Sequence, residues 1–600
     1  MHKFLSFIKE FRIPKKQDLG VAFASFSRKQ VMLLSMCVIV AFVTMVILAE
    51  KLNTSFMVEI PADGGSITEG IVGVPTLINP VLALSDADKD ITALVYSGLM
   101  RKTGDGSFVP DLAESFTVSD DGKIYTFRLR GTAVFHDGTP VTADDVALTI
   151  QMIKDPLIKS PRKPSWDGIT VEAKDAQTVV FTLIKPYISF MDATTLGILP
   201  SHLWRNVTPQ EFGLSPLNNK AVGSGPYRID SISRGDEGIP KTYVLKRFDD
   251  FTLGRPHIKR ITIVSYANEK DLVKGITSRS VDQASSLSPD NAALVAEKGR
   301  SVIHTATLPR MFGVFFNTTK NKVFADPAVI KAFDYALDRQ AIVDEVLEGY
   351  ATVIHNPVPE ELMSDAGDIR PRADREEASA VLDKAGWILG SDGIRSKSAT
   401  KTVTTTKKVG GKTVTEKSEV PTGPATRLAF TLTTGGTPEL ESTASLIQSQ
   451  LHAIGAEVEI KRVSETGQLN ALIRSRDYEA LFFGQIVNHE SDLYSFWHSS
   501  QKTDPGLNIA LYSDPKIDAI LENAQKTMDP EKRILAYKDF ITEFNKNSPA
   551  LFIYSPTYLY ATSKNLNNVY LDALTIPSDR FASIHTWYRE KDHVWKIFTK

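Results

Sequence analysis

A chain of 600 residues is too long for a single hydrophobic core, so we expect several domains or lobes. Its hydrophobic content of 42% and charged content of 23% are typical of a folded globular protein rather than a disordered one. The formal net charge of -2 excludes the global positive field that a nucleic-acid partner requires, and the single cysteine excludes an intramolecular disulfide and a cysteine-rich zinc site.

The first element in chain order is an uncharged apolar stretch at residues 31–49, which is long enough for a helix to cross a bilayer at about 1.5 Å per residue. Residues 1–30 carry seven Lys and Arg against two acidic side chains, so the positive-inside rule keeps them cytoplasmic and exports the rest. The stretch is longer than a signal-peptide core and no small-x-small cleavage site follows it. Met36 before Cys37 does not fit a lipoprotein cleavage site. The sequence therefore favours an uncleaved single-pass anchor in the cell membrane, a spacer at 50–60, and an extracytoplasmic C-terminal domain on the periplasmic or extracellular face.

Beyond the spacer, the chain alternates between the periods of strands and helices. Residues 123–130, 178–183 and 260–266 have the character of strands. Residues 327–347 and 441–455 have the i, i+3/i+4, i+7 apolar spacing of helices. A mixed α/β architecture is therefore expected.

One segment, residues 396–426, is almost devoid of large apolar side chains. It is predicted to be a polar insertion, either a disordered loop or an exposed hairpin that turns at Gly410-Gly411. Its G-G-K-T sequence resembles part of a phosphate-binding loop, but Thr406 stands where the first glycine is required. Nucleotide hydrolysis is therefore not expected.

Three further motifs begin like functional sites and then depart from them. Residues 86–90 have the opening spacing of an EF-hand, but Ile91 and Ser97 replace the required glycine and glutamate. A stretch that begins like a zincin helix has Leu493 in place of the second histidine, and V-G-S-G-P-Y at 222–227 lacks the G-x-S-x-G frame. We therefore expect no catalytic residues, no metal and no cofactor, and predict that the protein is not an enzyme.

The stretch F-H-D-G-T-P-V-T-A-D-D-V-A-L-T-I at 135–150 gathers one histidine and three aspartates. The Asp-Gly step at 137–138 predicts a turn, and Thr142 followed three residues later by Asp145 predicts a capped helix start. Acidic residues in a first helical turn stabilise it by roughly 0.3–1 kcal/mol each. The acids are thus explained by the fold, His136 flanks the turn, and catalysis or metal binding here is disfavoured.

The same region carries a family resemblance. The sequence P-D-L-A-E-S-F-T-V-S-D-D-G-K-I-Y-T-F-R-L-R-G-T-A-V-F-H-D-G-T-P-V-T-A-D-D-V-A-L-T-I at 110–150 strongly resembles the signature region of the family 5 extracellular solute-binding proteins. These are the oligopeptide- and dipeptide-binding receptors of ABC importers. Further matches include T-L-I-N-P at 76–80, V-G-S-G-P-Y-R-I, and F-A-D-P-A-V-I-K-A-F-D-Y-A-L-D-R-Q-A-I-V, and the resemblance runs over residues 76–568.

The resemblance implies a two-lobed α/β clamshell of the large peptide-binding type, preceded by the transmembrane helix. One lobe would comprise residues 61–306 plus 561–600. The other would span 307–560, with the polar insertion 396–426 as a peripheral excursion. Ligand would be enclosed between the lobes, and closure would be a hinge motion driven by a ligand that touches both.

The resemblance also implies where ligand binds. Peptide-binding members have a G-W-x-x-D pattern followed by D-P, in which the backbone pairs with the peptide and the first aspartate neutralises its amino group. In this chain Gly484 matches, Gln485 replaces the Trp, and Asn488 replaces the amine-binding Asp. Glu490 is therefore the alternative carboxylate, and the D-P position is Asp492 followed by Leu493. The expected ligand-contacting set is Gly484, Gln485, Ile486, Val487, Asn488, His489, Glu490, Asp492 and Trp497.

The function implied by the resemblance is that of a membrane-anchored, monomeric receptor that captures an oligopeptide and delivers it to ABC permease subunits. The departures in the binding stretch leave open another small solute, such as a metal chelate or a sugar. A clamshell used as a sensor or regulator is a second alternative, although residues 1–30 leave no room for an effector domain. A membrane-anchored hydrolase would need a catalytic motif, and the sequence has none.

Overall fold

The computed structural model describes residues 26–103, 107–186, 190–235, 238–358, 373–409, 412–421, 423–487, 492–527, 529–571 and 574–598. The chain divides into two compact units. The anchor unit combines Met1–Ala62 with Glu590–Lys600, and the main unit is Asp63–Arg589.

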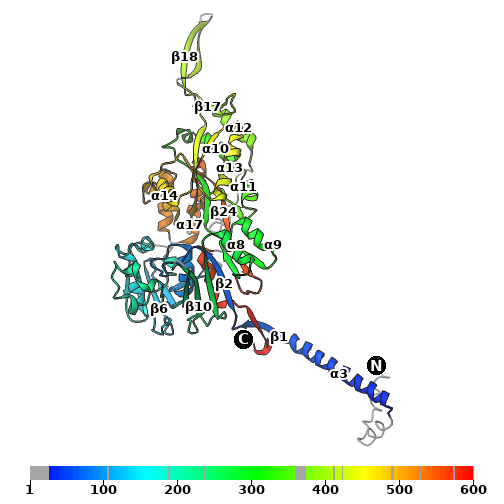
Figure 1. The fold of residues 1–600 in the computed structure, drawn as a ribbon. Coiled ribbons are helices and arrows are strands. Elements are labelled where there is room, and N and C mark those ends of the chain that lie inside the picture. The colour runs from blue at the N-terminus through cyan, green and yellow to red at the C-terminus, as the bar shows by residue number, and fades with distance from the viewer. Residues whose placement is uncertain are drawn as a thin grey trace, which may run out of the picture. The chain divides into compact units, whose positions relative to one another are not determined.

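The anchor unit is built on the helix α3 (Arg28–Ser55), drawn as a continuous blue helix in Figure 1. Among the described residues, α3 is the one helix that is both long enough and apolar enough to cross a membrane. It leads into the strand β1 (Met57–Ala62), which pairs antiparallel with β25 (Glu590–Trp595). The short helix η9 (Lys596–Phe598) follows. The stretch expected to be a spacer is thus the end of α3 and most of β1.

The main unit has two lobes with separate hydrophobic cores, as the sequence predicts. The first lobe contains the helices α4 (Asp86–Val95), α5 (Ala143–Lys154), α6 (Phe190–Ala193), α7 (Ser201–Trp204), α8 (Glu269–Thr277) and α9 (Pro289–Glu297). Its strands are β2 (Ser66–Val72), β3 (Met100–Lys102), β4 (Phe108–Pro110), β5 (Ala113–Val118), β6 (Ile124–Leu129), β7 (Ile169–Ala173), β8 (Thr178–Leu183), β9 (Tyr227–Arg234), β10 (Pro240–Arg247), β11 (Arg260–Tyr266), β12 (Gln283–Ser285) and β13 (Ser301–Thr307). Strands β5-β6-β8-β7 form a separate four-stranded sheet.

The second lobe contains the helices α10 (Pro327–Ala336), α11 (Arg339–Val346), α12 (Arg375–Lys384), α13 (Pro438–His452), α14 (Thr466–Ser475), α15 (Asp492–Trp497), α16 (Pro515–Lys526) and α17 (Pro530–Asn547). Its strands are β14 (Arg310–Phe316), β15 (Ala351–Val353), β16 (Ile388–Leu389), β17 (Arg395–Lys397), β18 (Thr400–Val409), β19 (Lys412–Pro421), β20 (Thr426–Arg427), β21 (Ala429–Gly435), β22 (Glu457–Val463) and β23 (Ala480–Ile486).

The strand β24 (Ala550–Ser563) is shared by both lobes. Its first half pairs with β14, and its second half pairs with β13 and β12. The chain therefore passes between the lobes at two adjacent places, around Leu308 and around Pro556. Two adjacent crossings of this kind can serve as the hinge of the closure that the resemblance implies.

Local sequence signals explain much of this structure. The helix α5 begins as predicted, because Thr142 N–H donates to Asp145 Oδ2 at 2.7 Å in a capping box. The helix predicted at 327–347 is instead broken into α10 and α11. Leu337 is extended there, and Asp338 caps the second helix by accepting a hydrogen bond from Ala341 N–H at 2.9 Å. An aspartate that caps a new helix competes with continuation of the old one.

The polar insertion forms a hairpin, which is one of the two predicted alternatives. Strands β18 and β19 pair antiparallel from Thr400↔Pro421 to Val409↔Lys412 (Figure 1). Gly410 and Gly411, predicted as its turn, lie outside the described residues. At its base, β17 pairs with β20.

Candidate functional site

The main unit contains a cavity of about 390 Å³. This volume lies within the range of small-ligand sites, roughly 300–1,000 Å³. Most of its wall comes from the first lobe: the end of α4, strand β3, residues 192–197, and the short helix η7 (Pro577–Phe581). Asp492, at the start of α15, contributes from the second lobe. Asp492 is thus the one wall residue among the expected ligand contacts, whereas the first-lobe wall residues were not expected to contact ligand, although Asp111 lies in the stretch that carries the family resemblance.

Charges of both signs line the cavity. The cationic side chains are Lys89, Arg101, Lys102 and Arg162, and the acidic ones are Asp111, Asp192, Asp492 and Asp579. Burial together with the charge on Arg101 lowers the pKa of His585 to about 4, so that imidazole is neutral near pH 7. The wall is thus balanced in formal charge, which suits a dipolar ligand better than a simple ion.

Arg101 is held by the first lobe itself. Its Nη1 donates to the Ala582 carbonyl oxygen at 2.8 Å and lies 3.2 Å from His585 Nδ1. Burial raises the pKa of the nearby Asp111 to about 6, with Arg101 opposing that rise. These two side chains therefore form a fixed polar corner of the cavity.

Arg162 has a different environment. Its Nε is buried and meets no hydrogen-bond acceptor among the residues that the structure describes. Burial lowers the pKa of its guanidinium, and Asp579 opposes that effect. Asp579 Oδ2 is already engaged, because it accepts hydrogen bonds from the backbone N–H groups of Thr575 at 2.8 Å and Ile576 at 2.9 Å. A guanidinium whose buried Nε has no partner, near a carboxylate that is already engaged, favours an external anion.

A buried ion-pair cluster fixes η7 beneath the cavity. Arg580 Nη2 donates to Glu69 Oε1 at 2.9 Å, and its Nη1 donates to Asp90 Oδ1 at 2.7 Å. Tyr560 adds a hydrogen bond to Glu69 Oε2 at 2.7 Å. The side chains of Arg580 and Glu69 are fully buried. Strands β2 and β24 and helix α4 are thereby tied to the segment that carries Asp579.

The predicted ligand-contacting set begins on β23, which pairs with β14 along its whole length. A Cβ on Gly484 would lie 2.7 Å from the Phe312 ring, so the close approach of that ring explains the glycine. Gln485 is buried, and its Oε1 has no partner among the described residues. Ile486 is exposed, whereas Val487 is buried and its N–H donates to the Pro309 carbonyl oxygen at 2.8 Å.

One edge of β23 is only partly occupied. Its register with β21 covers Leu432↔Ala480 to Thr434↔Phe482. From Phe483 to Ile486, no strand in the described part of the chain pairs with that edge. Backbone donors and acceptors that no strand pairs with can receive an added strand.

The remaining members of the set divide into three cases. Asn488, His489 and Glu490 lie outside the described residues. Asp492 begins α15 and lines the cavity. Trp497 is buried in the second-lobe core, with its ring 4.7 Å from that of Phe544 and 6.2 Å from that of Phe315. The described structure therefore brings Asp492 to the cavity and places Trp497 in the core.

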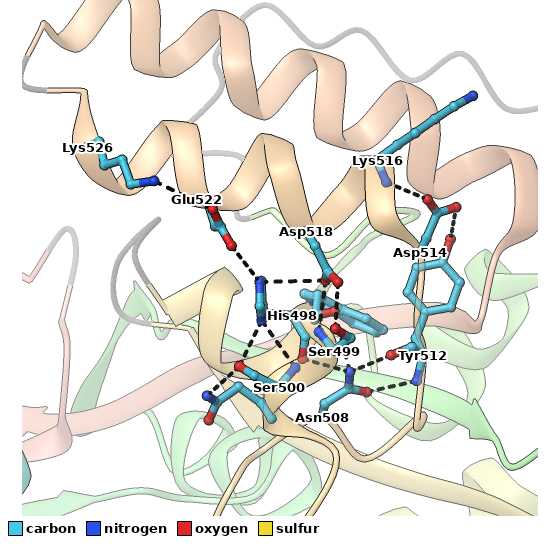
Figure 2. A network of polar contacts seen from close by, with 12 residues as sticks. His498, Ser499, Ser500, Asn508, Tyr512, Asp514, Lys516, Asp518, Glu522 and Lys526 are labelled. Carbon is cyan, nitrogen blue, oxygen red and sulfur yellow. Dashed lines mark hydrogen bonds and ion pairs between the residues drawn. The ribbon is translucent and has the colours of Figure 1, made fainter.

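A polar network fixes the C-terminal end of α15 on α16 (Figure 2). His498 Nδ1 accepts the Ser500 N–H at 3.2 Å, and its Nε2 faces carboxylate oxygens of Asp518 at 3.8 Å and Glu522 at 3.5 Å. Ser499 N–H donates to Asp518 Oδ1 at 2.8 Å. The short helix that presents Asp492 is thus held at its far end by the second-lobe scaffold.

The family model for bacterial extracellular solute-binding proteins, family 5 (middle region), matches residues 107–506. Protein XP55 of Streptomyces lividans is 27% identical over 534 residues, covering 87% of this chain and 88% of that protein. The oligopeptide-binding protein AppA of Bacillus subtilis (strain 168) is 27% identical over 521 residues, covering 84% of this chain and 89% of that protein.

Solved structures agree with this match. The structure of B. subtilis AppA in complex with a nonapeptide aligns with a TM-score of 0.66 at 25% identity, covering 88% of this chain and 100% of that one. NikZ from Campylobacter jejuni in complex with Ni(L-His) aligns with a TM-score of 0.68 at 25% identity, covering the same shares. The family match extends over more than half of the chain, and the two-lobed fold expected from the sequence is confirmed. The chain therefore belongs to the bacterial extracellular solute-binding proteins of family 5.

Proposed function

We propose that this protein is the membrane-anchored receptor of an ABC importer, and that it captures a peptide in the charge-balanced cavity of the main unit. Its relatives are substrate-binding proteins, and AppA binds a nonapeptide. The observation that carries the proposal is the cavity wall, which offers four cationic and four acidic side chains. A free peptide has both charges at its ends and alternating donors and acceptors between them.

The need for a polar ligand is visible at individual atoms. Several cavity-lining residues carry a buried polar atom with no hydrogen-bond partner among the described residues: Thr92, Tyr96, Arg101, Asp111 and Arg162. Leaving such an atom unpaired costs about 1–3 kcal/mol. If small side-chain shifts on binding open these atoms to the cavity, a ligand rich in both donors and acceptors recovers that cost.

The two lobes have different roles in this proposal. In the first lobe, Arg162 binds the carboxylate of the peptide, because its guanidinium is buried and weakly neutralised. In the second lobe, Glu490 and Asp492 attract the amino end, and the free edge of β23 pairs with the peptide backbone. A ligand held in this way touches both lobes and favours the closed state.

The cellular arrangement follows from α3. Its apolar length and the preceding basic residues support a retained anchor with the main unit outside the cytoplasm, serving permease subunits in the same membrane as a monomer. The ligand is released unchanged. A second candidate is an amino-acid metal chelate, since NikZ binds Ni(L-His) and such a ligand also presents carboxylates.

The test uses the full chain in lipid nanodiscs. Native mass spectrometry identifies the co-purified ligand, and calorimetry then compares free, C-amidated and N-acetylated forms of a binding peptide. We expect Arg162→Gln to weaken the free peptide about 10- to 100-fold, the range for a charged hydrogen bond, and to leave the amidated peptide unaffected. Arg128→Gln is the matched control, because Arg128 is an exposed arginine of the first lobe.

The results distinguish a peptide from a metal chelate, test the role of Arg162, and distinguish a receptor from a hydrolase. If a metal chelate co-purifies and no peptide binds, the second candidate, an amino-acid metal chelate, is the ligand. If Arg162→Gln weakens the free and the amidated peptide equally, Arg162 does not recognise the carboxylate. Cleavage of the peptide during incubation would contradict a receptor altogether.

A further inference from the structure

The C-terminal end of the chain returns to the point where α3 ends. Strand β25 pairs with β1, so that Trp595 lies opposite Met57, two residues beyond the helix. Trp595 Nε1 donates to Asn53 Oδ1 at 2.9 Å, within the last turn of the helix. Lys596 N–H donates to the Phe56 carbonyl oxygen at 3.0 Å. The segment 595–598 is therefore attached directly to the end of the membrane-spanning candidate.

This end of the anchor unit exposes large apolar side chains. Ile597 is 77% exposed and Phe598 is 76% exposed, in a chain that buries most of its aromatic residues. Trp595 in the same segment, and Phe56 and Leu52 at the end of α3, are also exposed. The rings of Trp595 and Phe56 lie 6.5 Å apart. Five large apolar side chains at one place form a patch that water solvates poorly.

Polarity changes sharply along the β1–β25 ribbon. The two pairs nearest the helix, Met57↔Trp595 and Val58↔Val594, are apolar. The next pair is Glu59↔His593, and Glu59 also bonds Lys591 at 2.8 Å. At about 3.3 Å per residue, charge begins roughly 7 Å beyond Met57. An apolar end followed by a charged end is the profile of an element that rises out of a membrane interface.

The length of α3 places the patch at the right depth. Its 28 residues span about 42 Å, and a bilayer with its headgroup layers is about 40–45 Å thick. If Arg28 lies at the cytoplasmic headgroups, Ser55 lies at the outer ones. Trp is enriched at that level, and a lysine such as Lys596 can extend its ammonium to the headgroups.

We propose that residues 595–598 lie in the outer interface of the membrane that α3 crosses, as a second contact between this protein and lipid. Trp595, Ile597 and Phe598 insert among the upper acyl chains, and Lys596 remains with the phosphates. The inference rests on the proposed anchoring by α3. It adds a role for residues 595–598, which join the first exported strand to the lipid surface.

Spin labels on the full chain in vesicles of phosphatidylcholine and phosphatidylglycerol test the proposal. In a Cys37→Ser background, single cysteines are introduced at Ile597, at Val40 in the apolar run, and at the exposed Leu214 of the main unit. Collision with oxygen, which partitions into lipid, is compared with collision with a water-soluble nickel chelate. We expect the label at 597 to favour oxygen several-fold over the label at 214, and to lie shallower than the label at 40.

The labels at 597, 40 and 214 distinguish failure of the contact at 595–598 from failure of the anchor. An aqueous signal at 597 together with a lipid signal at 40 would overturn the C-terminal contact and leave the anchor intact. An aqueous signal at 40 would overturn the anchor and the inference with it. The vesicles contain no permease, so protection at 597 cannot come from contact with a permease. A further variant combines Ile597→Ser and Phe598→Ser with a spin label at Trp595→Cys. We expect this label to collide more with the water-soluble nickel chelate than it does without the serine substitutions. An unchanged lipid signal at 595 would contradict insertion by Ile597 and Phe598.

Discussion

His136 illustrates how distant partners change the meaning of a residue. Its Nε2–H donates to the Gly225 carbonyl oxygen at 3.0 Å, and its Nδ1 accepts the Gly223 N–H at 3.3 Å. The bond at Nδ1 requires the neutral ring, because a protonated Nδ1 cannot accept, whereas the Nε2–H can donate in either state. Burial accordingly lowers the pKa of His136 to about 4. The sequence suggested only a side chain that flanks a turn, whereas the structure makes it the link between two loops.

These hydrogen bonds of His136 predict that the folded protein becomes less stable in acid. Between pH 6.5 and 4 the unfolded chain binds a proton at this histidine and the native chain does not, so stability falls as the pH falls through that window. We expect about 2–3 kcal/mol to be lost from this group, and His136→Gln to flatten that dependence. Thermal unfolding of the full chain between pH 7.5 and 4 measures it. His593→Gln, at an exposed histidine of the anchor unit, should leave the profile of the wild type, and an equally steep profile for His136→Gln would contradict the assignment.

Local signals predicted individual side chains only where the partners are close in sequence. Asp145 was predicted as a helix cap from a spacing of three residues, and it accepts the Thr142 N–H as expected. Arg101, Arg162 and Asp579 could not be found in that way. They line one cavity although Arg162 follows Arg101 by 61 residues and Asp579 follows Arg162 by 417. Proximity of this kind is created by tertiary packing, which a single sequence does not display.

At the level of elements, the hairpin β18–β19 is separate from the rest of the fold. Its strands pair with each other in their own two-stranded sheet, and the base is already closed by the pairing of Lys397 with Thr426. The sequence predicted a peripheral insertion here because large apolar side chains are missing. The sequence does not decide between a loop and a hairpin, since alternating Thr, Lys and Val suit either state.

Removal of the hairpin should therefore leave the receptor functional. Replacing residues 400–421 with a short Gly-Ser linker is expected to change ligand affinity less than about twofold and the melting temperature by about 2 °C or less. Calorimetry and thermal unfolding measure both quantities. A deletion of 395–427 is the contrast, because Arg395 donates to the Ile454 carbonyl oxygen at 2.9 Å inside the second lobe, and this deletion should unfold that lobe. Loss of ligand binding in the shorter deletion would give the hairpin a role in the site.

At the level of the whole molecule, the two-lobed architecture was predictable from the sequence, and the connection between the lobes was partly predictable. Alternating strand and helix periods indicated α/β lobes, and the family resemblance supplied the clamshell. The shared strand β24 shows how the lobes are joined, since one continuous strand belongs to both sheets. A bend near Pro556 would move the lobes while preserving most of the ladder on either side.

Ligand binding should close this hinge. In the Cys37→Ser background, spin labels at Leu214→Cys in the first lobe and Leu535→Cys in the second report the distance between lobes. We expect saturating ligand to shift the distances to a shorter and narrower distribution, and to stabilise the protein by about 2.7 kcal/mol at one hundred times Kd. Labels at Ile184→Cys and Leu214→Cys, both in the first lobe, should not move relative to each other. An unchanged distance between lobes at saturation would contradict closure.

Arg580 also sets the order in which the chain can finish folding. Glu69 and Asp90 leave the ribosome early, whereas their counter-charge follows 511 and 490 residues later. Until it arrives, two carboxylates lie in a lobe that cannot bury them without a large desolvation penalty. A product shortened by premature termination would therefore keep an open first lobe and remain a substrate for proteases. Arg580 thus acts as a late control on the first lobe, because only a chain synthesised beyond it can neutralise these two acids.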